Sequence, residues 1–353
     1  MPTGFFDPAK IPSAGDSFHT DLNGLVRMLD KYGVAVLPSV LDSQECSRMQ
    51  DGMWDAVEEA TSQFTGTVVP VSRTDPSTWV NMRELYPSHG SLIQHFGLGN
   101  AKFAFDVRQN PKVIEAFERI HHPTSARDLL SSIDGVNIRL QAEWNSKARP
   151  SSLWLHTDRA FHTDYTKESV QSWVTAHHVG PQDATLVVLV GSHKLHKEFG
   201  QHFGLTSWKK DWFKLETDEQ HRFFMDRGCR IMRIECPAGS QVLWKSTTMH
   251  CGAGPATGNQ LHPRLVVYCC YAPRSWAKPA RILAKQKAIL EGRMTTHDPV
   301  KNLLFGRFPQ TYGRQLQPIK NPTSYAPEEF TSLGKRLFAL DFRVKQDVKK
   351  MKQ

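Results

Sequence analysis

Apolar positions near the start of the chain recur at helical spacing. Segment 22–33 places four apolar residues on one face, with Asp21 as a capping residue before it and Gly33 at its end. The apolar run 34–40 follows and is typical of a strand. Asp42 and Glu45 then form a capping box for a helix over 43–64. The chain is therefore predicted to begin helix, strand, helix.

The pattern changes after about residue 133. A further helix is expected over 110–122, where Pro111 suits the first turn. The later residues alternate between apolar and polar or form short β-branched runs. These strand-like segments are 136–144, 169–179, 184–191, 229–237, 240–246 and 264–273. Helices followed by many short strands predict an α+β protein whose functional centre is a β-sandwich or barrel.

Composition and charge narrow the class of protein. The six cysteines include no Cys-x-x-Cys pair and are sparse for 353 residues, so we expect no disulfide scaffold and a reducing compartment, the cytoplasm. We find no secretory signal and no stretch long enough to cross a bilayer, so a soluble protein without a membrane partner is expected. The net charge of +9 favours anionic partners: a carboxylate cosubstrate, an acidic substrate or nucleic acid. The basic tail 335–350 is expected to form an amphipathic closing helix.

The triplet His-Thr-Asp occurs three times, at 156–158, 162–164 and 19–21. Two imidazoles and one carboxylate on one side of Fe(II) leave the other side open, which is the facial triad of non-haem oxygenases. Such a site needs a second, distant histidine. His250 is the best candidate, because a strand-like run leads to it and a Gly-rich turn follows. Fourteen residues later Arg264 opens another strand, where its guanidinium could clamp a carboxylate.

Six motifs between Asp134 and Pro273 occur in a fixed order: DGVN, WLHTD, VQSW, VVLVGSHKLH, KSTTMHCGAGP and HPRLVVY. In them the chain resembles the phytanoyl-CoA dioxygenase-like (PhyH) branch of the Fe(II)/2-oxoglutarate-dependent dioxygenases. The resemblance implies an α+β fold with a double-stranded β-helix (jelly-roll, cupin-like) core and with N-terminal and flanking helices. We expect one domain over 1–353: helical support over 1–130, the jelly roll over 131–275 with an insertion at about 200–228, and a helical extension over 276–353.

The resemblance also distinguishes the triplets. In the family, a Gly-Ser-His turn lies about three dozen residues after the first ligand. His156 lies 35 residues before Gly191 and follows the strand-like approach 151–155, whereas His162 lies 29 residues before it. The implied metal ligands are His156, Asp158 and His250.

The other two copies keep alternative interpretations. His162 and Asp164 stay open as an alternative ligand pair, as a solvent-facing loop cap, or as a lid whose histidine contacts substrate. In the third copy, Asp21 is explained as a helix cap.

The alternation of side chains along two strand-like segments predicts which residues line the pocket. Asn137, Arg139 and Gln141 share one side of their strand, as do Gln171, Trp173 and Thr175 on theirs. A polar side within a barrel faces a ligand, although a solvated sheet face is the alternative. By resemblance, Asn137 and Thr175 contact 2-oxoglutarate, Trp173 walls the cofactor, and Arg264 pairs with its far carboxylate. The expected substrate contacts are Arg139, Gln171 and His162.

The resemblance implies an enzyme that uses Fe(II), 2-oxoglutarate and O₂. It would oxidise an unactivated C–H bond of a small, carboxylate-bearing metabolite of secondary metabolism and release succinate and CO₂. Hydroxylation is favoured over halogenation because Asp158 supplies a carboxylate ligand; desaturation and oxidative cyclisation stay open. The alternatives are a hydroxylase of protein or nucleic acid and a non-catalytic jelly-roll binding protein. The sequence does not determine the oligomeric state.

Three remaining features are assigned no direct part in the chemistry. His193 is expected to be a hydrogen-bonded structural residue. Cys251 is expected to pack rather than to act as a nucleophile, because no base accompanies it. The aromatic segment 208–212 is expected to cover the active site rather than to stack on bases.

Overall fold

The computed structural model describes residues 5–66, 68–87, 92–122, 128–140, 153–256, 261–311 and 317–343. The chain divides into two compact units, each built from separate stretches of sequence. Unit 1 comprises Met1–Ser39, Trp144–Gln171 and His177–His262. Unit 2 comprises Val40–Glu143, Ser172–Ala176 and Pro263–Gln353. The single-domain layout expected from the sequence stays a prediction, and Gln141 lies outside the described residues.

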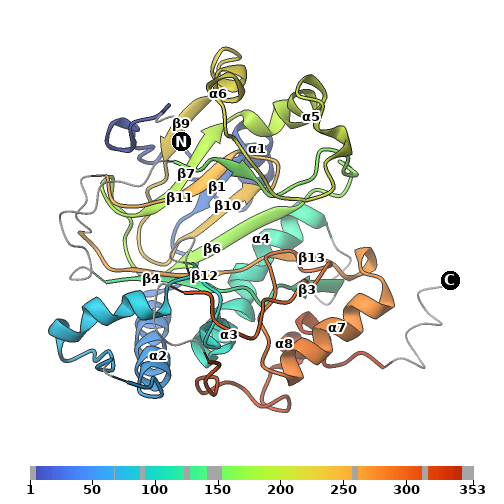
Figure 1. Ribbon diagram of the computed structural model, residues 1–353. Coiled ribbons are helices and arrows are strands. Elements are labelled where there is room, and N and C mark those ends of the chain that lie inside the picture. Colours follow the sequence, from blue (N-terminus) through green and yellow to red (C-terminus); the bar gives the residue numbers. More distant parts are fainter. Residues whose placement is uncertain are drawn as a thin grey trace. The chain divides into compact units, whose positions relative to one another are not determined.

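Helices occur in both units, and Figure 1 labels the α-helices. The α-helices are α1 (Leu25–Tyr32), α2 (Ser43–Thr61), α3 (Lys102–Arg108), α4 (Pro111–His121), α5 (Ser192–His202), α6 (Asp218–Met225), α7 (Pro279–Leu290) and α8 (Ser332–Leu337). The 3₁₀ helices are η1 (Pro8–Lys10), η2 (Pro76–Leu85), η3 (Leu98–Asn100), η6 (Leu205–Ser207) and η7 (Arg274–Trp276). Within the described ranges, no helix combines the length and the apolar character that crossing a membrane requires.

The strands are short, and neighbouring strands pair in antiparallel fashion. They are β1 (Val34–Leu37), β2 (Leu92–Ile93), β3 (Leu129–Ser131), β4 (Val136–Arg139), β5 (His156–Thr157), β6 (Val170–Thr175), β7 (Thr185–Val190), β8 (Phe213–Lys214), β9 (Arg230–Arg233), β10 (Gln241–Lys245), β11 (His250–Ala253), β12 (Arg264–Tyr268) and β13 (Tyr271–Pro273). Helices together with antiparallel strands confirm the α+β class predicted from the sequence.

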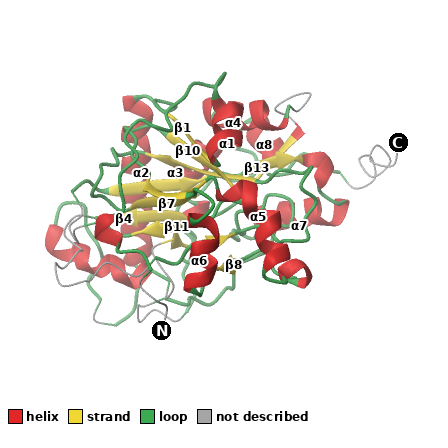
Figure 2. Cartoon of the chain, turned by 90° about the horizontal axis from the view of Figure 1, so that it is seen from above, coloured by secondary structure: helices red, strands yellow, loops and turns green. Residues whose placement is uncertain are grey.

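Unit 1 contains a five-stranded sheet in the order β8-β5-β11-β7-β9, and β1 pairs with β10. Side chains alternate between the two faces of the sheet. One face packs Leu155, Val187 and Cys251 into an aromatic cluster with Phe199 of α5 and Phe224 of α6. Helices α5 and α6 accordingly lie against this sheet in Figures 1 and 2. The opposite face is the one that carries His156 and His250.

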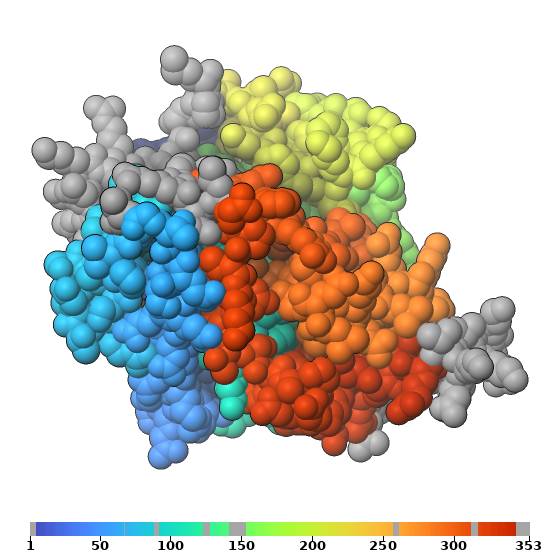
Figure 3. All heavy atoms as spheres, turned by 60° about the horizontal axis from the view of Figure 1, so that its bottom comes forward, coloured from blue at the N-terminus to red at the C-terminus, as the bar shows by residue number. Residues whose placement is uncertain are grey.

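In unit 2, β12 pairs with β6 on one side and with β4 on the other, and β2 extends β4. The two-stranded sheet of β3 and β13 lies in the same unit. Leu130 of β3 packs with Ile282 of α7 and with Phe342, which follows α8. The corresponding orange-to-red segments form a continuous part of the surface in Figure 3. This packing buries Ile282 of α7 and the residues that follow α8 against β3.

Several predicted elements are confirmed. Helix α2 begins with the expected capping box, in which Asp42 accepts a hydrogen bond from the Glu45 backbone and Glu45 accepts one from the Asp42 backbone, each at 2.8 Å. Helix α4 begins at Pro111. All six strand-like segments contain strands, although each strand is shorter than its apolar pattern.

Three predicted boundaries are wrong. Helix α1 begins at Leu25, because the Asp21 carboxylate caps the preceding turn by accepting from the Gly24 backbone at 2.8 Å. Residues 153–155 form no strand, so the strand at the first triplet is only β5. His250 begins β11 after a short turn, instead of lying at the rim of a Gly-rich turn.

The predicted closing helix over 335–350 is also wrong in its described part. Helix α8 ends at Leu337, and Ala339 takes a left-handed φ of 59°, which a continuing right-handed helix does not allow. The chain turns there because Ala339 and Phe342 pack into the cluster around Leu130. Residues 344–350 lie outside the described residues.

Candidate functional site

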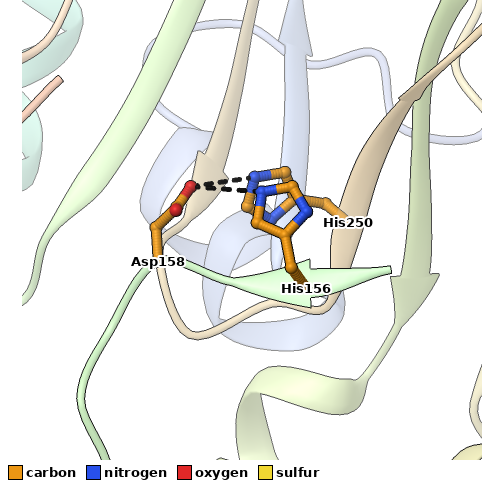
Figure 4. A group of neighbouring side chains, drawn as sticks. All are labelled: His156, Asp158 and His250. Atoms are coloured by element: carbon orange, nitrogen blue, oxygen red, sulfur yellow. Dashed lines mark ion pairs between the residues drawn. The ribbon is translucent and has the colours of Figure 1, made fainter. Parts of the chain in front are cut away.

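Three side chains of unit 1 converge at the ends of two paired strands. His156 opens β5, His250 opens β11, and the two residues face each other in the antiparallel register. Directly opposed side chains share one face of a sheet, and here the two ring centroids lie 4.4 Å apart. Asp158 lies two residues after His156 and projects to the same side. One ligand atom from each residue lies within 4.8 Å of the others (Figure 4).

Backbone carbonyls orient both imidazoles. The Nδ1 of His156 lies 3.2 Å from the carbonyl oxygen of Trp154, and the Nδ1 of His250 lies 2.8 Å from that of Thr248. A carbonyl only accepts, so each Nδ1 donates and each Nε2 keeps its lone pair. Both Nε2 atoms face Oδ2 of Asp158, at 3.5 Å and 3.3 Å. Two imidazole nitrogens and one carboxylate form the donor set that suits a non-haem Fe(II) ion.

Both imidazoles are buried, and for His250 burial favours the protonation state that a metal ligand needs. His156 is 5% exposed and His250 is 4% exposed. Burial lowers the pKa of His250, the neighbouring His156 lowers it further, and the Asp158 carboxylate partly opposes the shift. The neutral form of the His250 imidazole is therefore favoured, and only the neutral form of an imidazole can coordinate a metal.

A hydrogen-bond network fixes Asp158. Its Oδ2 accepts a hydrogen bond of 2.9 Å from Nε2 of Gln171, which is buried at the start of β6. Its backbone N–H donates to the carbonyl of Ser246 at 3.1 Å, and the hydroxyl of Thr157 donates to the same carbonyl at 2.9 Å. The alternating pattern placed Gln171 in the site as a substrate contact, whereas its amide is engaged with the carboxylate. No local pattern indicates this pair, because Asp158 follows β5 whereas Gln171 lies in β6.

Three tryptophans surround the imidazoles. The ring of Trp154 stacks on His156, with centroids 4.4 Å apart and planes inclined by 8°. The ring of Trp244 lies 5.4 Å from that of His250. Trp212 belongs to the segment expected to cover the site, and its ring lies 5.9 Å from His156 while the residue stays 44% exposed. Of these contacts, only the cover by segment 208–212 was anticipated from the sequence.

The second triplet lies in an exposed loop. His162 and Asp164 are both exposed, and Oδ1 of Asp164 accepts a hydrogen bond of 3.0 Å from the backbone of Thr166. This is the geometry of a loop cap, which agrees with that interpretation of the copy. In the third triplet, Asp21 caps a turn and His19 pairs with Asp16 at 3.1 Å. The described part of the chain groups three metal-ligand side chains only at His156, Asp158 and His250.

The residues predicted to contact 2-oxoglutarate lie together in unit 2. Val266 of β12 pairs with Asn137 of β4 and with Thr175 of β6, so these side chains share one face. On the same face Arg264 lies opposite Arg139 and Trp173 lies opposite Tyr268. The guanidinium carbon of Arg264 lies 5.1 Å from the ring centroid of Trp173.

Burial argues against the alternative of a solvated sheet face. Asn137, Trp173, Thr175 and Arg264 are all buried, and Arg264 is only 4% exposed. Arg139, at the end of β4, is half-buried. A buried arginine beside a buried tryptophan, in a row with two buried polar residues, is the arrangement expected of a carboxylate pocket.

The expected structural residues behave as such. Nε2 of His193 lies 3.1 Å from the carbonyl oxygen of Asp30, and burial lowers the pKa of this histidine to about 4. Cys251 is fully buried, and burial raises its pKa to about 12, so its thiol stays protonated. Neither side chain is a candidate for chemistry.

Comparisons with known proteins agree with this site. Residues 29–264 match the model of the phytanoyl-CoA dioxygenase (PhyH) family. The chain is 28% identical over 236 residues to Ava biosynthesis cluster protein O of Aspergillus versicolor. This alignment covers 64% of this chain and 71% of that protein.

Solved structures show the fold. A crystal structure from Salmonella typhimurium LT2, provisionally named an oxidoreductase, aligns with a TM-score of 0.56 and 12% identity over 91% of this chain and 85% of that one. A hypothetical protein from Escherichia coli aligns with a TM-score of 0.53 and 12% identity, with the same coverage. The predicted jelly-roll fold is confirmed.

Proposed function

The chain belongs to the phytanoyl-CoA dioxygenase family and is an Fe(II)/2-oxoglutarate-dependent dioxygenase, and we propose that it oxidises an unactivated C–H bond of a small, carboxylate-bearing metabolite. One observation carries this proposal: the convergence of His156, Asp158 and His250 within 4.8 Å, on strand ends far apart in sequence. The relative from a biosynthesis cluster and the net charge of +9 support a small, anionic substrate.

In this proposal the three side chains hold Fe(II) from one side. Both imidazoles bind through Nε2, since their Nδ1 atoms donate to backbone carbonyls. Asp158 binds through its carboxylate, which Gln171 keeps in place. When bound together with 2-oxoglutarate and O₂, the iron supplies the oxidant for the C–H bond, and succinate and CO₂ leave as co-products.

Arg264 is proposed to receive the far carboxylate of 2-oxoglutarate. Its guanidinium stays charged even when buried and offers a planar pair of donors to a carboxylate. The ring of Trp173 lies beside this group, with its centroid 5.1 Å from the guanidinium carbon. Asn137 and Thr175, which both pair with Val266, are proposed to donate to the same ligand.

The substrate is proposed to contact Arg139 and His162. Arg139 lies directly opposite Arg264 at the end of β4, so a second positive charge stands beside the cosubstrate residues. His162 lies on the exposed loop that begins after Asp158. Hydroxylation is the favoured outcome, because Asp158 occupies the ligand position that a halide would need.

An anaerobic titration with Fe(II) and 2-oxoglutarate tests the proposal. The wild-type protein should develop the weak visible charge-transfer band of the chelate. His250→Ala should abolish the band, whereas His202→Ala, which removes an exposed histidine at the end of α5, should keep it. Arg264→Met should leave Fe(II) binding intact and raise the 2-oxoglutarate concentration needed for the band. A band of normal strength in His250→Ala would refute the proposed metal site.

A further inference from the structure

The metal-bearing face of the unit 1 sheet continues onto its edge strand. Strand β8 pairs with β5 so that Lys214 lies opposite His156 and Phe213 lies opposite Thr157. Phe213 belongs to the aromatic cluster on the opposite face. Because side chains alternate, Lys214 and Trp212 project on the face that carries the triad. The 5.9 Å separation of the Trp212 and His156 rings agrees with this assignment.

The ammonium of Lys214 is the second feature of this face. It makes no ion pair or hydrogen bond with any described residue, although the side chain is half-buried. Lys245, in contrast, is held by the carboxylates of Asp30 and Glu168. A half-buried ammonium directly opposite His156, without a charged partner among the residues that the structure describes, is available to an incoming anion.

The same face is open beside the triad. Gly252 lies two residues after His250 in β11 and is exposed, and a Cβ added there would meet no atom within 4 Å. The indole N–H of Trp154 donates to the Gly252 carbonyl at 3.0 Å, which holds this ring against His156. Trp212 is 44% exposed, a large value for an indole next to a buried metal ligand. The open face at Gly252 is therefore bordered by two indole rings, those of Trp154 and Trp212, and by the ammonium of Lys214.

We propose that Trp212 and Lys214 form a substrate-recognition strip for planar organic carboxylates. The Lys214 ammonium pairs with the substrate carboxylate, and the Trp212 indole lies along a flat, apolar part of the same molecule. This inference rests on the proposed function, because it assigns the substrate class of the same site. It assigns no contact to the flanking Lys209 and Lys210, which are exposed.

The test uses the anaerobic protein loaded with Fe(II) and 2-oxoglutarate, so that the cosubstrate site is filled. Two probes are compared by equilibrium dialysis: 2-naphthylacetate and the neutral 2-(2-naphthyl)ethanol. Wild-type protein should bind the acid about tenfold more tightly than the alcohol, which corresponds to one charge-assisted contact. Lys214→Met should reduce this ratio to about one, whereas Lys209→Met, the matched control, should keep it. Trp212→Ala should weaken both probes by similar factors.

The charge-transfer band distinguishes failure of the proposed function from failure of the proposed recognition strip. If wild-type protein forms no band, the proposed function fails before recognition is tested. If the band forms in wild type and Lys214→Met, but the acid does not bind or its preference survives in Lys214→Met, the recognition strip is refuted. A Gly252→Leu variant adds an independent check: it should exclude both probes while the band is retained, because the added side chain fills the open face.

Discussion

The two neighbouring copies of His-Thr-Asp, six residues apart, lie in different surroundings: one in a paired strand and one in an exposed loop. His156 is 5% exposed and lies in a strand that is paired on both sides, with β11 and with β8. His162 is exposed in a loop, and Asp164 caps the backbone of Thr166. The residue types are identical. What differs is whether backbone pairing fixes the direction of the side chains.

The loop of the second copy is held by a different device. The Arg159 guanidinium donates to the carbonyls of Asp164, at 3.2 Å, and of Lys167, at 2.9 Å. His196 of α5 is fully buried and bridges the Arg159 carbonyl, at 3.0 Å, and the Tyr165 hydroxyl, at 2.8 Å. Strand pairing therefore positions the first copy, and a buried histidine anchors the second.

Removing one histidine from each copy tests the difference between the two copies most strongly. His156→Ala should weaken Fe(II) binding more than about 100-fold, because a direct ligand contributes more than its supporting groups. His162→Ala should change the affinity less than about twofold, since the residue lies in the exposed loop. Isothermal titration of the anaerobic proteins measures both. If His162→Ala lost the metal and His156→Ala kept it, the triad would have to be reassigned.

A second variant tests the support of the first copy. Gln171→Leu removes the amide that donates to Oδ2 of Asp158 and puts an apolar side chain of similar size in its place. Fe(II) affinity should fall about 10- to 100-fold, the usual effect of losing a group that orients a metal ligand. Gln44→Leu, on the exposed face of α2, is the matched control and should bind as wild type does. Equal affinities in Gln171→Leu and wild type would show that this hydrogen bond does not position Asp158.

A third variant tests the anchor of the second copy through pH. Burial lowers the pKa of His196 to about 4, below its ordinary value of 6.5, so the folded protein keeps this histidine neutral. The stability it contributes is present above pH 6.5 and is lost as the pH falls toward 4. Between pH 7 and pH 5 wild type should lose about 1–2 kcal/mol more than His196→Gln.

Urea unfolding at the two pH values measures this difference. The low pKa values of His121 and His193 are shared by both proteins, so the difference isolates His196. An identical pH dependence of the two proteins would contradict the assignment.

The sequence predicted the helix starts that depend on residues close to one another in the chain. The capping box at Asp42 and the proline at the start of α4 fix helix starts through neighbouring residues, and both helices begin there. The tail helix was wrong because its apolar residues pack against Leu130, which is about two hundred positions away in sequence. A periodic pattern cannot indicate such a partner. The strand approach before His156 was wrong for the same reason, since β5 exists only where β8 and β11 pair with it.

The candidate site shows the same division. The sequence nominated the three residues that converge, because the order of motifs carries that information. It did not indicate that Gln171 binds Asp158, nor that Lys214 lies opposite His156. These relations depend on the register between strands, and a shift of one residue would turn each side chain to the other face.

The close stack of Trp154 on His156 has a practical consequence. An indole 4.4 Å from a metal-binding imidazole is an intrinsic fluorophore within quenching range of any paramagnetic ion bound there. Its emission should therefore fall when such an ion binds, without label or substrate. Trp154→Phe should reduce this change but not remove it, because the rings of Trp244 and Trp212 also lie beside the two histidines.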